Sequence, residues 1–169
     1  KNALGKNTTA DHNTAVGNGS FSENTTGTNN TGCGYNTGQN NTTGGNNTAI
    51  GDFALNANTT ADNNTSVGYA ALLSNTTGSS NTAVGSNTLD ACTTGALNSA
   101  LGKNALTSLT TADYCDAVGF EALLNVTTGD YNIGIGANAA DALTTGTGVI
   151  AIGSNSFGAG TGSYNTAIG

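Results

Sequence analysis

The sequence predicts an all-β fold, a β-solenoid (β-roll or β-helix) of about ten coils, each formed by one copy of a 17-residue repeat. Three observations lead to this prediction. The segment that starts at Asn13 recurs in steps of 17 residues, one position of every copy is Gly, and each copy has only about two large apolar residues. So short a unit cannot bury a core alone, but stacked copies can, because equivalent side chains then lie about 4.8 Å apart.

The repeats give the single domain its internal boundaries. Residues 1–12 form a half repeat, residues 13–164 form nine repeats, and residues 165–169 form another half repeat after a step of 16 residues. The consensus is N-T-A-[VI]-G-x-x-A-L-x-x-N-T-T-G-x-x, with positions numbered 1 to 17. Helical repeats are longer, about 33 to 47 residues, and Gly, Asn and Thr are weak helix formers, so a helical solenoid is not expected.

Position 5 is Gly in every copy. Glycine adopts positive φ and allows close backbone approach without a Cβ penalty. An unbroken Gly column therefore predicts the same tight corner in every coil. These corner glycines are Gly17, Gly34, Gly51, Gly68, Gly85, Gly102, Gly119, Gly136 and Gly153.

Positions 4 and 9 are expected to form the core. Position 4 is apolar in every copy, with Cys33 as a small apolar filler, and position 9 is mostly Leu. Because side chains alternate along a strand, positions 2 and 4 are expected to point inward together, as in Ile133 with Ile135. The predicted core residues are Val16, Ile50, Val67, Val84, Leu101, Val118, Ile135 and Ile152 at position 4, and Leu55, Leu72, Leu89, Leu106 and Leu123 at position 9.

Position 12 changes character along the chain. It is Asn in the first half, from Asn7 to Asn75, and then Cys92, Leu109, Val126 and Leu143. A position that accepts both Asn and Leu is expected to be partly buried. In the first half it predicts an Asn ladder, in which each amide bonds the amide of the next coil.

The charge of the chain argues against several partners. The formal net charge is −7, with ten acidic residues and only three Lys and Arg together. Nucleic-acid binding needs clustered cations, so neither nucleic acid nor an anionic membrane surface is an expected partner. No apolar run approaches the length of a transmembrane helix, so membrane insertion is not expected either.

Residues that perform catalysis or bind metals are sparse. A catalytic nucleophile needs a base within reach, and the only histidine, His12, falls at the variable position 17. Cys33, Cys92 and Cys115 have no metal-binding spacing, and a disulfide between the last two stays open. We expect no enzyme activity, no metal and no cofactor. The acidic residues at position 16, which are expected to be solvated, are Asp11, Asp62, Asp113 and Asp130.

The two ends of the sequence match complementary parts of the repeat. Lys1, Asn2, Ala3 and Leu4 fit positions 6 to 9, and Thr166, Ala167, Ile168 and Gly169 fit positions 2 to 5. Two interpretations follow. Either copies stack end to end and complete a shared coil, which gives a filament, or the chain is a stretch of a longer array. Both predict a fibrous structural protein that assembles with itself, outside a cell, on its surface or on a virion.

The N-T-A-[VI]-G-x-x-A-L-x-x-N-T-T-G pattern, over the whole chain, resembles repeats of phage tail-fibre proteins and large bacterial surface proteins. It is also similar to the shorter A-[IV]-G repeats in the heads of trimeric autotransporter adhesins. That resemblance implies left-handed winding and assembly as a trimer. The repeats of those heads are nearer 14 residues, and no neck or stalk follows in this sequence.

The outer columns offer an alternative function, binding of a receptor or a glycan through Thr, Asn and Tyr side chains. Neighbouring Thr residues at positions 13 and 14 point to opposite faces, which leaves one outward Thr per coil. Ice binding is therefore a weaker alternative. Asn29, Asn46 and Asn63 open N-x-[ST] sequons at Gly-flanked connections and are the candidate glycosylation sites.

Overall fold

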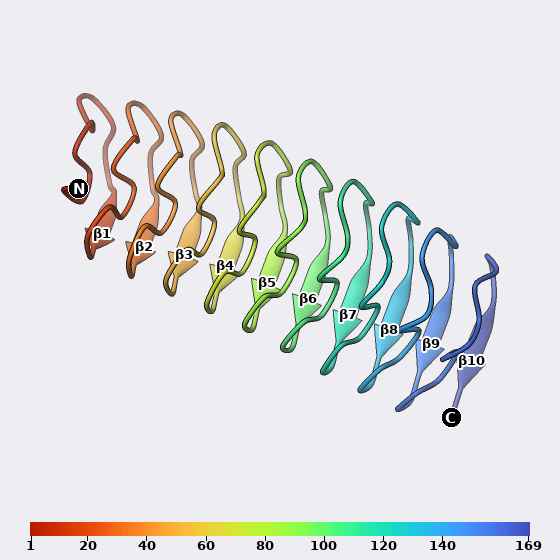
Figure 1. Ribbon diagram of the computed structural model, residues 1–169. Helices are drawn as coiled ribbons and strands as arrows, with labels where there is room; N and C mark the ends of the chain where they lie inside the picture. Colours follow the sequence, from red (N-terminus) through yellow and green to blue (C-terminus); the bar gives the residue numbers. More distant parts are fainter.

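The computed structural model describes residues 1–169 as a coil that carries one short strand in every turn (Figure 1). The ten strands form a single parallel sheet in sequence order, with no helix, and this confirms the predicted β-solenoid. The strands are β1 (Thr14–Val16), β2 (Thr31–Cys33), β3 (Thr48–Ile50), β4 (Thr65–Val67), β5 (Thr82–Val84), β6 (Ser99–Leu101), β7 (Asp116–Val118), β8 (Ile133–Ile135), β9 (Ile150–Ile152) and β10 (Thr166–Ile168).

The register of the sheet follows the repeat. Thr65 pairs with Thr82 and Val67 with Val84, so equivalent positions lie directly above one another. At the last step Ile150 pairs with Thr166, 16 residues on. The side-chain amide of Asn165 donates to the carbonyl of Gly162, as that of Asn132 does to Gly129. The missing residue therefore falls in the Thr-Thr pair, which is reduced to Thr161.

A series of turns follows each glycine corner. In the third coil, the amide of Ala54 donates to the carbonyl of Gly51 at 3.1 Å, and that of Asn56 donates to Phe53 at 3.3 Å. The third residue of each turn, Phe53 and then Leu55, has a positive φ of 61° and 54°, as a type II turn requires. Such a φ costs an ordinary residue about 1–2 kcal/mol. Burial of the position-9 side chain and bonds to the next coil offset this cost.

The core is confirmed at position 9 and corrected at position 4. Leu55, Leu72, Leu89, Leu106 and Leu123 are all fully buried. They pack with small residues of positions 3 and 8, mainly Ala, in one continuous cluster.

The inward assignment of position 4 was wrong. Six of the predicted position-4 core residues are exposed and two are half-buried; the exposed ones are Val16, Ile50, Leu101, Val118, Ile135 and Ile152, and the half-buried ones are Val67 and Val84. Cys33 is exposed as well, and Ile133 and Ile150 at position 2 are only half-buried.

The reason is the size of the position-9 side chain. Strand residues do alternate, but position 3 points inward, and the core there has room only for a small residue. A Cβ added at Gly32 would lie 2.7 Å from the Phe21 ring, and one at Gly134 would lie 2.7 Å from Leu123. The larger side chains of positions 2 and 4 therefore face out.

Two buried columns of Asn side chains run along the coil. At position 12 the predicted ladder is confirmed: the amide of Asn41 donates to Asn24 at 2.8 Å, and that of Asn58 donates to Asn41 at 2.7 Å. The second column, at position 1, was not predicted. There the Asn64 side-chain oxygen accepts the backbone amide of Asn81, and its nitrogen donates to the carbonyl of Gly78.

Candidate functional site

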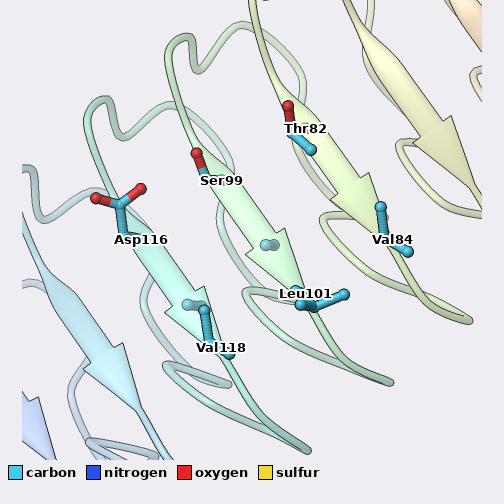
Figure 2. A pocket seen from close by; sticks show the side chains of 8 residues that line it. Thr82, Val84, Ser99, Leu101, Asp116 and Val118 are labelled. Carbon is cyan, nitrogen blue, oxygen red and sulfur yellow. The ribbon is translucent and has the colours of Figure 1, made fainter.

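The outer face of the sheet carries two columns of side chains, from positions 2 and 4. Figure 2 shows part of this face, with Thr82, Ser99 and Asp116 in one column and Val84, Leu101 and Val118 in the other. The position-4 column is apolar in all ten coils, and Leu101 is 52% exposed. We call this column the apolar stripe; it consists of Val16, Cys33, Ile50, Val67, Val84, Leu101, Val118, Ile135, Ile152 and Ile168.

The position-2 column divides this face into two halves. It holds Thr from β1 to β5 and Ile in β8 and β9. Asp116 in β7 is the only charged side chain in either column. The face is therefore mixed at one end and apolar on both columns near the other.

A shallow hollow of about 260 Å³ lies on this face over β5 to β7. Its walls are the side chains of the two columns, and Ala100 and Ala117 also line it. In Figure 2 the Leu101 side chain extends along the face between Val84 and Val118. The hollow is almost wholly apolar, with the hydroxyl of Ser99 and the carboxylate of Asp116 in the position-2 column.

A row of aromatic side chains lies beyond the glycine corners. The Tyr35 and Phe53 rings meet edge to face at 5.4 Å between centroids, and the Phe53 and Tyr69 rings at 6.2 Å. Tyr35 and Tyr69 are 47% and 57% exposed. Asp52 occupies the coil between them, where one carboxylate oxygen accepts the backbone amide of Tyr35 at 2.8 Å. This aromatic row combines exposed rings with a polar acceptor.

The position-17 column lies on the surface. His12 is exposed, and Tyr114 stacks on Tyr131 with 5.0 Å between ring centroids. Asn29, Asn46 and Asn63 are exposed with φ near 60°. These three sequons are therefore accessible, whereas the Asn residues of the position-12 ladder from Asn24 to Asn75 are buried.

The Thr-Thr pairs behave as the alternation predicts. At position 13 the hydroxyls from Thr25 to Thr127 donate to the Thr carbonyl of the next coil, as Thr59 does to Thr76 at 3.1 Å. The position-14 neighbour, such as Thr60, is exposed. One Thr column is thus part of the scaffold and the other faces solvent.

Three of the position-16 carboxylates have a structural contact. Asp62 accepts the backbone amide of Gly45 at 2.6 Å, Asp113 that of Ala96 at 2.7 Å, and Asp130 that of Asp113 at 2.9 Å. The expectation that these acids are merely solvated was therefore incomplete. Each ties its own coil to the preceding one.

The three cysteines are free and lie in different environments. Cys33 is exposed on the apolar stripe, whereas Cys92 and Cys115 are buried in the position-12 and position-1 columns. Burial raises the pKa of the Cys92 thiol to about 12 and that of Cys115 to about 11. Cys33 is thus the accessible thiol.

The residues from the two ends of the sequence lie at opposite ends of the coil (Figure 1). Leu4 packs against the core, and β10 pairs with β9 alone. No group of three His, Cys, Asp or Glu side chains comes together as a metal site would require. No helix has the length and hydrophobicity needed to cross a membrane.

Fold and surfaces together define a parallel β-solenoid repeat protein. No protein-family model matches the chain, and comparison with curated proteins and with solved structures finds no significant match.

Proposed function

We propose that the protein is a structural element of a fibre outside a cell or on a virion, a rod built by stacking of coils. The observation that supports this is the continuity of its bonding along the axis. Backbone amides, Asn side chains and the position-13 Thr hydroxyls bond from coil to coil over the length of the chain. Ten coils spaced by about 4.8 Å give a rod about 50 Å long.

The rod grows by adding a further coil to the free edges of the sheet. β1 pairs only with β2, and β10 only with β9. An exposed edge of backbone groups is a template for another strand. In end-to-end stacking, Thr166, Ala167, Ile168 and Gly169 of one copy and Lys1, Asn2, Ala3 and Leu4 of the next contribute to one shared coil.

Electron microscopy of the purified protein tests this proposal. We expect filaments with an axial repeat near one chain length. In Thr166→Pro they are expected to shorten to single rods, because position-2 amides such as that of Thr82 donate to the following coil and proline has no amide hydrogen. Thr166→Val keeps the amide and is the matched control. Discrete rods from the unmodified chain at every concentration would contradict end-to-end stacking.

A second candidate function is binding of a glycan, favoured by the aromatic row. Exposed Tyr rings beside a carboxylate suit the apolar faces and hydroxyls of a neutral sugar, and no Lys lies in these coils. A glycan array with the unmodified chain and a Tyr35→Ala/Tyr69→Ala variant tests this, with Phe120→Ala as the control on another coil. Binding that survives loss of both tyrosines, or no binding, would argue against it.

A further inference from the structure

We propose that copies of this chain also associate side by side, parallel and in register, through the apolar stripe. This contact is lateral and does not depend on end-to-end stacking. It concerns a surface that the stacking of coils leaves exposed from β1 to β10. The binding partner that we infer for this surface is a second copy of the same chain.

The size of the stripe supports a protein contact. Eight of its ten residues are exposed and two are half-buried, so together they expose on the order of 700 Å², close to the roughly 800 Å² that each partner buries in a standard interface. The largest apolar patch on a typical monomer is about 300–600 Å². An apolar surface of this extent along one line of the molecule is therefore expected to be a site of protein association.

The periodicity of the stripe indicates that the partner is another copy of the chain. One apolar side chain projects from each of ten coils at the spacing of the strands. A partner that covers every one needs apolar side chains at the same spacing over the same length. A second copy supplies that array.

The difference between the two halves of the face selects the parallel orientation. In an antiparallel pair the two position-2 columns face each other in reverse order, so the hydroxyls of Thr31 and Thr48 would lie toward Ile150 and Ile133. In a parallel pair related by a twofold axis along the rod, the two position-2 columns lie on opposite sides of the stripe and do not face each other. Asp116 then stays at the rim, where its carboxylate keeps its water, because the stripe and not the position-2 column forms the centre.

The hollow over β5 to β7 fits the same arrangement. At about 260 Å³ it has room for an aliphatic side chain. Leu101 is the largest exposed side chain in the middle of the stripe. In register, Leu101 of the second copy meets Leu101 of the first at the edge of this hollow and packs into its apolar part.

The test uses the Thr166→Pro background, so that failure of axial stacking and failure of lateral pairing give different results. We expect light scattering after size exclusion to give a multiple of the 16.4 kDa chain mass. Leu101→Lys is expected to reduce it to one chain mass, because a buried, unpaired ammonium is unfavourable. Thr111→Lys, on the solvent-facing position-14 column, is expected to leave the assembly intact.

Cross-linking through Cys33 tests whether the two copies are parallel. A short bis-maleimide is expected to join Cys33 of one copy to Cys33 of another, while Cys92 and Cys115 stay unmodified inside the core. A Cys33→Val variant is the control for the site of linkage. A single chain mass up to millimolar concentration, or an assembly unaffected by Leu101→Lys, would overturn the lateral interface. Linkage of Cys33 to an introduced Ile152→Cys thiol, without Cys33 to Cys33 linkage, would overturn the parallel orientation.

Discussion

At each corner of the coil a carbonyl group from the following coil occupies the space where a side chain would begin. Gly119 has a φ of +136°, and a Cβ added there would lie 2.6 Å from the carbonyl oxygen of Gly136. Both the backbone angle and the neighbour exclude any other residue. The corner glycines are therefore required twice over, by conformation and by stacking.

Gly119→Ala is expected to destabilise the protein by at least about 2 kcal/mol, since strain at a glycine-only φ costs about 1–3 kcal/mol before the steric clash is counted. Gly45→Ala is the control. Its φ is ordinary, the nearest atom to the new Cβ is 3.1 Å away, and Ala96 already stands at its equivalent position. Denaturant titration of both variants measures the difference, and equal losses would contradict the explanation.

The buried Asn ladder couples residues in neighbouring coils. Replacing Asn58 by Leu leaves the side-chain oxygen of Asn41 without its donor and removes an acceptor from Asn75. We expect a loss of about 2 kcal/mol, the cost of an unsatisfied buried polar group. The double variant Asn58→Leu/Asn75→Leu is expected to cost less than the sum of the two single changes. Strict additivity in a double-mutant cycle would contradict the ladder.

The buried thiols make stability depend on pH. Because their pKa values are raised to about 12 and about 11 in the folded state, unfolding releases protons once the pH exceeds the ordinary thiol value near 8.5. Their stabilising effect is complete below that pH and is lost as the pH rises, at up to about 1.4 kcal/mol per unit for each thiol. Cys92→Val/Cys115→Val is expected to flatten the decline between pH 8 and 11. An unchanged slope would rule this cause out.

The sequence did not determine which face of each strand points into the core. Spacing alone predicts the coil, the glycine corners and the buried Leu column. Both sides of each strand, however, carry apolar residues, so the pattern of positions 2 and 4 suggested the wrong inner face. The deciding signal was the small residue at position 3, Gly32 beside Phe21 for example. The aromatic row and the hollow are each formed by residues of several coils. They depend on how turns and strands align between coils, and the sequence of a single repeat does not show this.

Two leucines of one coil test this orientation. Leu106 is fully buried, whereas Leu101 on β6 is 52% exposed. Leu106→Ala is expected to lower the free energy of unfolding by about 2–5 kcal/mol, and Leu101→Ala by under about 1 kcal/mol in dilute monomer. Thermal or denaturant unfolding compares them directly. Equal losses would mean that both side chains are buried.

For the whole molecule, stability depends on how many neighbours each coil has. The position-3 alanines are fully buried in the middle, as Ala83 and Ala117 are, but only half-buried in β1 and β10. In repeat proteins, stability is close to a sum over units and their interfaces. Interior coils are therefore bonded on both sides and terminal coils on one.

Hydrogen exchange is expected to reflect this gradient. Amides of β4 to β7 should exchange slowest, and those of β1 and β10 fastest, because terminal coils open without disrupting the rest. Mass spectrometry of exchanged peptides measures the profile in the Thr166→Pro background, where end-to-end contacts are removed. Uniform protection along the chain would show that the rod opens only as one unit.

The direction of the bonds between coils also sets how the rod responds to force. Because they run along the axis, a pull on the two ends loads the bonds of one coil after another instead of shearing many at once. Each coil that detaches frees 17 residues, which extend to about 55 Å at roughly 3.3 Å per residue, from about 5 Å when stacked. Under tension the rod therefore lengthens about tenfold in small, successive steps and dissipates work at each one, so that it yields gradually before it breaks.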